Sequence, residues 1–185
     1  MSEAIPSDEE RRWEVVGADE VIHRGWISVS RRTYRLPDGR EAAWEMVGRA
    51  GGQAVGVLAL TPDGRLVCVR QFRPGHERVV LGLPGGFVDD GESPEEAAAR
   101  ELAEETGYVG RDLECVVSLR TTSALGQRHV VIARDCRLET EQRLDEYEDC
   151  EPVILDVADV RAELRAGRMA ATDLTYLALD HLDLL

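Results

Sequence analysis

One stretch, Gly86–Tyr108, restricts the possible folds of this chain more than any other part of it. It reads GFVDDGESPEEAAARELAEETGY and has the form G-x5-E-x7-R-E-U-x-E-E-x-G-U, in which U is a bulky apolar residue. The fixed positions are filled by Gly86, Glu92, Arg100, Glu101, Leu102, Glu104, Glu105, Gly107 and Tyr108. Each of these nine positions accepts only one residue or one kind of residue. It is very improbable that a chain fills all nine at this spacing by chance.

The same stretch carries the signals of one helix. Ser93 followed by Pro94 and Glu96 predicts a capped helix start with a capping box. Residues 95–106 are rich in Ala, Glu, Leu and Arg, which are strong helix formers. Gly107 can take the left-handed conformation that ends a helix. We therefore expect a helix over 95–106.

On that helix, Glu101 and Glu105 lie one turn apart on one face, with Glu104 beside them. Crowded carboxylates repel one another unless a positive charge compensates. Oxygen-only ligands suit Mg²⁺ or Mn²⁺, so the helix is a candidate metal site. The alternative is a solvated acidic face with pairs such as Arg100–Glu104. Gly86 in the glycine loop before the helix, Glu92 and Arg100 all stand at the distances from the glutamates that the pattern requires. This agreement favours the metal site.

The bulk properties restrict the partners. The chain has 185 residues, 43% of them hydrophobic, which suits one compact domain with an extension. Its formal net charge of −14 disfavours a nucleic-acid partner. We expect no membrane span and no signal peptide. The four cysteines are widely spaced, so we expect reduced thiols in a cytoplasmic protein.

The order of expected elements indicates the fold class. Strands over Trp26–Leu36 and Arg40–Arg49 flank the turn Pro37-Asp38-Gly39 and predict a hairpin. Further expected strands cover 53–60, 65–72, 79–83, 113–120, 128–135 and 151–157, and two further helices follow residue 157. We expect an α/β fold, an α/β/α sandwich with a mixed sheet over 50–185, plus an N-terminal β-hairpin arm over 1–49. A half-polar hairpin is marginal alone, so the arm is expected to dock on the main body or a second subunit.

The Gly86–Tyr108 pattern resembles the signature of the Nudix hydrolases. Nearly the whole chain resembles one branch of that family, the ADP-ribose and sugar-nucleotide pyrophosphatases. The phrases that carry this likeness are WEMVGR, VRQFRPG, LPGGFVDDGE and DEYEDCE. The resemblance implies hydrolysis of a nucleoside diphosphate sugar into two monophosphates by a homodimer whose N-terminal strands contribute to the partner's site.

The resemblance also implies roles for particular residues. The divalent ions, Mg²⁺ or Mn²⁺, would be held by the backbone oxygen of Gly85 and by Glu101, Glu104, Glu105 and Glu148. Arg100 would orient the glutamates by ion pairing, and Glu92 would have a similar structural role. Glu146, in the acidic loop before the last strand, would be the general base. The alternative is that this loop is an ordinary acidic surface loop without a catalytic role.

For the substrate, the resemblance implies that Trp26 and Trp44 stack on the base. Glu45 would accept from its exocyclic amine, Arg49 and Arg73 would contact the diphosphate, and Phe87 would line the rest of the pocket. Each arginine also has an ordinary interpretation as a surface residue. In a regular strand Glu45 and Arg49 share one face and Trp44 points to the other. Either the strand is bulged there, or Trp44 serves the core or a dimer interface.

Two departures from the branch leave the substrate open. Residues 122–126, TSALG, stand where ADP-ribose hydrolases have a Ser-Pro-Gly-like turn, and Gly82 replaces a usual glutamate. ADP-ribose, ADP-sugars and GDP-mannose are therefore all candidates. Two other functions remain open: a non-catalytic regulatory protein that binds such a ligand, and a hydrolase of damaged nucleoside triphosphates. The N-terminal arm disfavours the second of these.

Overall fold

The computed structural model describes residues 7–185, which divide into two compact units. One unit comprises the chain up to Gly52 together with Arg120–Gly126, and the other comprises Gln53–Leu119 and Gln127–Leu185. The expected arm, 1–49, falls in the first unit, and its residues 1–6 lie outside the described residues. That the loop 120–126 belongs with this unit was not indicated by the sequence.

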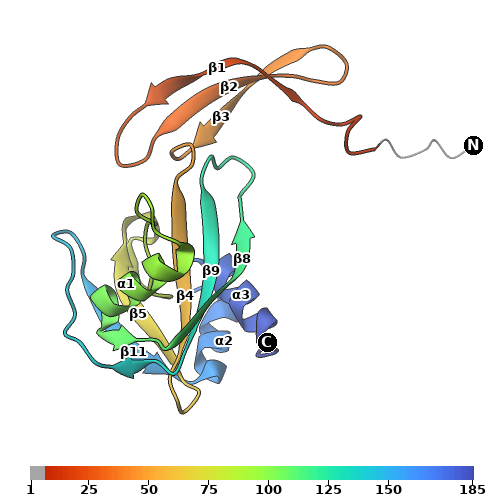
Figure 1. Cartoon of the computed structure of the whole chain (residues 1–185). Coiled ribbons are helices and arrows are strands. Elements are labelled where there is room, and N and C mark those ends of the chain that lie inside the picture. Colours follow the sequence, from red (N-terminus) through yellow and green to blue (C-terminus); the bar gives the residue numbers. More distant parts are fainter. Residues whose placement is uncertain (1–6) are drawn as a thin grey trace, which may run out of the picture. The chain divides into compact units, whose positions relative to one another are not determined.

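The first unit is built on a three-stranded antiparallel sheet in the order β1-β2-β3 (Figure 1). Its strands are β1 (Glu14–His23), β2 (Val29–Arg35) and β3 (Glu41–Val47). The expected hairpin is present, and Gly39 N donates to Leu36 O in its turn at 2.9 Å. Both of its strands are shorter than expected, so Trp26 lies in the bend before β2. The arm is thus three strands rather than two.

The second unit contains a mixed sheet in the order β11-β5-β4-β9-β8, with β6 also paired to β5. Its strands are β4 (Gln53–Leu60), β5 (Leu66–Arg73), β6 (Arg78–Gly82), β8 (Asp112–Leu119), β9 (Gln127–Arg134) and β11 (Cys150–Leu155). Strands β4 and β9 run parallel, and the other pairs are antiparallel. A 3₁₀ turn, Pro74–His76, follows β5, and a small ribbon pairs β7 (Tyr108–Val109) with β10 (Arg137–Leu138).

Helices cover both faces of this sheet (Figure 1). Helix α1 (Pro94–Thr106) packs Ala97, Ala98 and Leu102 on one face, against side chains such as Val57 and Ala59 of β4. Helices α2 (Val157–Arg165) and α3 (Thr172–His181) pack on the other face. The expected α/β/α sandwich is confirmed.

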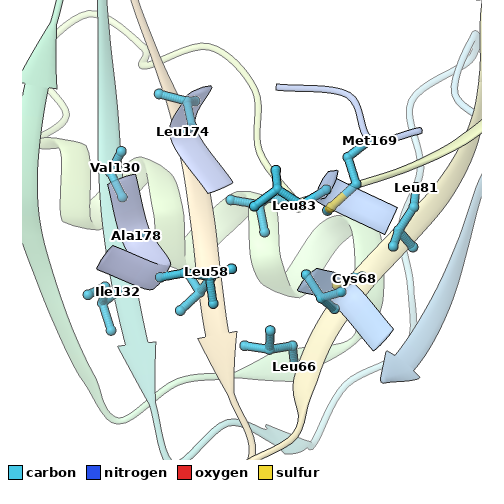
Figure 2. Close-up of a cluster of buried hydrophobic side chains, with 13 residues drawn as sticks. Leu58, Leu66, Cys68, Leu81, Leu83, Val130, Ile132, Met169, Leu174 and Ala178 are labelled. Atoms are coloured by element: carbon cyan, nitrogen blue, oxygen red, sulfur yellow. The ribbon is translucent and has the colours of Figure 1, made fainter. Parts of the chain in front are cut away.

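The core on the second face contains the alternate residues of the same strands. Figure 2 shows Leu58 of β4, Leu66 of β5 and Ile132 of β9 in one buried cluster with Leu174 and Ala178 of α3. Burial on both faces explains why these strands read as continuous apolar runs rather than as alternating ones.

The signals read for α1 are present as hydrogen bonds. Ser93 Oγ accepts from Glu96 N at 3.2 Å, and Glu96 Oε2 accepts from Ser93 N at 2.8 Å. Gly107 ends the helix at φ +75°, with its N–H donating to Ala103 O. Local signals therefore fix both ends of α1, and with them the positions of its glutamates.

Across residues 7–185, every helix is too short or too polar to traverse a lipid bilayer.

Candidate active site

Helix α1 carries two acidic side chains on the face that it packs against the sheet. Glu101 and Glu105 are only 9% and 3% exposed, and they are one turn apart, in line with the buried Ala97, Ala98 and Leu102. Burying an ionised carboxylate is costly unless it is compensated. A purely structural helix gains nothing from two such acids on its packing face, so their burial marks a site.

Burial raises the pKa of both acids. Desolvation is the largest cause for Glu105, whose pKa rises to about 7, while the hydrogen bond from Gly85 N opposes the rise. For Glu101, desolvation raises the pKa and Arg100 opposes it. The negative charge of Glu148 raises the pKa of both, which places this residue of the acidic loop close to them.

The glycine loop before α1, which contains Gly85 and Gly86, lies in close contact with these two acids. Gly85 N donates to Glu105 Oε2 at 2.9 Å. Gly85 has φ +151°, and a Cβ there would lie 2.2 Å from Val55 O. A Cβ on Gly86 would lie 2.4 Å from Glu101 Oε1. Both positions therefore require glycine, one for the backbone and one for the carboxylate.

Arg100 joins Glu92, which precedes α1, to two acidic side chains of the helix. Its guanidinium forms a two-point pair with Glu92, with Nε–Oε1 and Nη2–Oε2 distances of 2.9 and 3.0 Å. Nη1 donates to Glu101 Oε1 at 2.8 Å and to Glu104 Oε2 at 3.2 Å, and Nη2 donates to Phe87 O at 2.9 Å. This pairing with Arg100 lowers the pKa of Glu92 to about 2. Arg100 thus pairs with two of the α1 glutamates, Glu101 and Glu104, as well as with Glu92, and its role in a reaction stays a prediction.

Arg100→Lys is expected to lower kcat by about 10²-fold, because lysine keeps the charge but loses the planar fork that spans Glu92, Glu101 and Glu104. Steady-state kinetics measures kcat, and thermal denaturation shows whether the variant stays folded. Arg168→Lys is the matched control, since Arg168 makes a similar two-point pair with Glu163, an acid on α2. Equal kinetics for the two variants would contradict an orienting role for Arg100.

The donor atoms of this site fit a hard divalent cation. They are carboxylate oxygens, the ligands that such cations prefer, and a cation would offset the cost of burying Glu101 and Glu105. Within residues 7–185, no three His, Cys, Asp or Glu side chains converge tightly enough to hold an ion. Instead Nη1 of Arg100 bridges Glu101 and Glu104. The metal assignment of Gly85, Glu101, Glu104, Glu105 and Glu148 therefore stays a prediction.

Strand β11 contributes a residue to this site that the sequence analysis missed. Cys150 Sγ lies 3.6 Å from Glu105 Oε1, and Gln71 is the β5 residue paired with Cys150. Among the buried side-chain oxygens and nitrogens of the described chain, only Gln71 Oε1 lacks a hydrogen-bond partner. Gln71 lies in the phrase VRQFRPG and Cys150 in DEYEDCE, but the sequence assigned a role to neither, and only the strand pairing brings them together.

The expected general base lies in the acidic loop. Glu146 is exposed in a turn in which Glu148 N donates to Asp145 O at 3.0 Å and Glu148 Oε2 accepts from Asp145 N at 3.2 Å. The roles of Glu146 and Glu148 stay predictions.

Two of the expected substrate residues lie in the second unit. Arg73 is the last residue of β5, and Phe87 follows the glycine loop with 65% of its surface exposed. Ala54 of β4 forms an isolated bridge with Phe87, which fixes the backbone of the loop to the sheet. Phe87 O also accepts from Arg100, so the Phe87 ring stands on an anchored backbone.

The other four lie in the first unit, where the structure decides between the two expected strand geometries. Pairing of β2 with β3 is continuous from Val29↔Val47 to Arg35↔Glu41, so β3 has no bulge. Trp44 and Glu45 therefore point to opposite faces. The expectation that Arg49 shares a strand face with Glu45 is wrong, because β3 ends at Val47 and Gly48 has φ +93°.

The tryptophans of the first unit differ in their surroundings. Trp44 packs edge-on against Trp13 with ring centroids 6.0 Å apart, and Trp13 packs edge-on against Tyr34. Trp44 is still 44% exposed, whereas Trp26 is 91% exposed. Glu45 pairs with Arg31 at 3.6 Å. Trp26 is therefore the more available stacking surface.

An open groove elsewhere in the second unit does not belong to the acidic site. Its lining includes Arg70, Leu81, Val153, Leu155 and Ala162. Leu81, Val153 and Leu155 belong to the core cluster under α2 and α3, so the groove lies on the face of the sheet opposite α1.

Comparisons with known proteins show what the chain is similar to. The NUDIX domain family matches residues 51–174. An ADP-ribose pyrophosphatase of Bacillus subtilis is 35% identical over 172 residues, which cover 91% of each chain. An ADP-sugar pyrophosphatase of Mus musculus is 40% identical over 111 residues, 55% of this chain and 51% of the mouse protein. The crystal structure of an ADP compounds hydrolase matches both chains over their full length, with a TM-score of 0.76 and 24% identity, which shows a shared fold.

Proposed function

The chain belongs to the Nudix family and is a hydrolase, and from that premise we propose that it splits the diphosphate bridge of ADP-ribose or a related nucleoside diphosphate sugar. Water attacks one phosphorus, the P–O bond to the bridging oxygen breaks, and a nucleoside monophosphate and a sugar phosphate leave. The observation that carries the proposal is the buried pair Glu101 and Glu105, held by the glycine loop and Arg100. The B. subtilis relative, aligned over 91% of each chain, supports the substrate class.

Nudix hydrolases generally use divalent metals, and we propose Mg²⁺ or Mn²⁺ here. Glu101, Glu104, Glu105 and Glu148 would hold the ions, with the backbone oxygen of Gly85. When bound, such ions neutralise charge on the phosphate oxygens and orient the attacking water. Arg100 keeps Glu101 in place through the pair that it forms with Glu92.

We propose Glu146 as the general base that takes the proton of the attacking water. Its exposed position in the turn leaves the carboxylate accessible to water and substrate. Glu146→Gln is expected to lower kcat by about 10²–10⁴-fold, with no change in thermal stability, because only proton transfer is lost. Glu141→Gln, an exposed acid of the same loop, serves as the control and should leave kcat unchanged. Wild-type turnover by Glu146→Gln would remove the assignment.

For nucleotide recognition we propose Trp26 as the stacking platform, with Trp44, Glu45 and Arg49 also contributed by the first unit. Arg73 and Phe87 would complete the contacts to the diphosphate and the sugar. We further propose that the protein is a cytoplasmic homodimer formed through the first unit. The exposed apolar residues of that unit support this, among them Val15, Val21, Ile22, Ile27 and Val47. Light scattering at micromolar concentration tests it.

A substrate panel tests the proposed function. ADP-ribose, ADP-glucose, GDP-mannose and oxidised nucleoside triphosphates are incubated with the protein and Mg²⁺, and the products are separated by chromatography. We expect AMP and ribose 5-phosphate from ADP-ribose, and little release from the triphosphates. Turnover of triphosphates alone would overturn the substrate class. Tight binding without turnover would instead favour a regulatory protein.

A further inference from the structure

The acidic loop, residues 139–149, is tied to the C-terminal end of α1 by backbone hydrogen bonds. Glu139 N and Thr140 N both donate to Gly107 O at 3.1 Å, and Arg143 N donates to Glu104 O at 2.8 Å. The last carbonyls of a helix have no partner within the helix. The loop supplies donors to them, so its first part is fixed to the helix that carries the buried acids.

One side chain, Gln142, extends this connection to β11. Its Nε2 donates to Glu105 O at 2.6 Å and to Cys150 O at 2.7 Å. Both amide protons are thereby used. Glu105 is the most buried acid of the site, and Cys150 is the first residue of β11 and contacts the Glu105 carboxylate through Sγ. Gln142 thus joins the helix end to the strand at the residues nearest the acid.

The span between these anchor points contains Glu146 and Glu148. It runs from Leu144 to Asp149, with Arg143 fixed on one side and Cys150 on the other. A span of this length wanders unless both of its ends are held. A displacement of about 1 Å at a reacting group is enough to lower a rate by about 10²-fold.

We propose that Gln142 is a positioning residue, whose amide holds the two ends of this span so that Glu146 and Glu148 keep a fixed place relative to Glu105. The roles of Glu146 and Glu148 rest on the function proposed above, whereas the connection through Gln142 does not. Gln142 itself does not touch the substrate or the reacting atoms.

Three substitutions separate donation from bulk. Gln142→Leu keeps a similar size but has no donor, and Gln142→Glu presents a negatively charged acceptor to two carbonyls, one of them at the C-terminal end of α1. Gln142→Lys has three donors and matching charge, so it can contact both oxygens. We expect kcat to fall by about 10–100-fold in the leucine and glutamate variants, with KM within about 2-fold. The lysine variant should recover most of the wild-type kcat, and Glu141→Leu, at the neighbouring exposed position, should leave it unchanged.

Amide hydrogen exchange without substrate provides a second readout. We expect exchange at Arg143 to be about 10-fold faster in Gln142→Leu than in the wild type, and close to wild type in Gln142→Lys. A folded leucine variant with wild-type kcat, or a folded lysine variant as impaired as the leucine variant, would overturn the proposal. If the wild type hydrolyses no diphosphate, the proposed function fails, and unchanged exchange in Gln142→Leu would still overturn the connection itself.

Discussion

Glu105→Gln is expected to lower kcat by at least about 10³-fold while leaving the protein folded. Glutamine has the shape of glutamate and keeps an oxygen that can accept from Gly85 N, but it supplies no negative charge to a cation. The carboxylate is 3% exposed, and desolvation raises its pKa to about 7, so its burial opposes folding in the absence of a cation. We therefore expect the free energy of unfolding of the metal-free variant to equal or exceed that of the wild type.

Steady-state kinetics and urea denaturation in the presence of a chelator measure these two effects. Glu163→Gln, at an exposed acid of α2 paired with Arg168, is the control and should leave kcat unchanged. A large loss of stability in Glu105→Gln would indicate a structural acid. Retained turnover would show that the charge of Glu105 has no part in the reaction.

Alanine at Gly86 and alanine at Gly85 are expected to fail in different ways. The Cβ at Gly86 meets the Glu101 carboxylate at 2.4 Å, and a side chain can move, so Gly86→Ala should fold. With Glu101 displaced, we expect kcat to fall by about 10²-fold. The Cβ at Gly85 meets Val55 O at 2.2 Å, and the residue has φ +151°. Gly85→Ala should therefore lose about 3 kcal/mol or more of unfolding free energy.

Gly75→Ala is the matched control for both variants, because nothing lies within 4 Å of its added Cβ. Urea denaturation and kcat, measured on all three, separate the two effects. If Gly86→Ala kept full activity, Glu101 would not need its present position. If Gly85→Ala were as stable as Gly75→Ala, the glycine loop would not be pressed against β4 as described.

The sequence was sufficient for the elements that depend on local signals. The capping residues of α1 and the continuous apolar runs of β4 and β5 predicted these elements to within a residue, and through them the burial of both sheet faces. Because the helix register was correct, Glu101 and Glu105 were also correctly placed on one face. These features follow from interactions between residues close together in the chain.

Features that depend on distant pairing were not predictable in the same way. Where β3 ends is decided by its partner β2 and by Gly48, so the sequence placed Arg49 wrongly. Cys150 reaches the site because β11 pairs with β5, and Gln142 does so because its loop folds back on α1. No local pattern distinguishes these residues from ordinary thiols and amides.

The central claim is that the buried acids of α1 bind divalent ions at the diphosphate bridge of the substrate. A crystal structure with Mg²⁺ and a methylene-bridged analogue of ADP-ribose tests it most directly. We predict ions bound by Glu101 and Glu105 oxygens at about 2.0–2.1 Å and by oxygens of the analogue's diphosphate. Ions and analogue bound away from α1, with no contact to Glu101 or Glu105, would contradict the account.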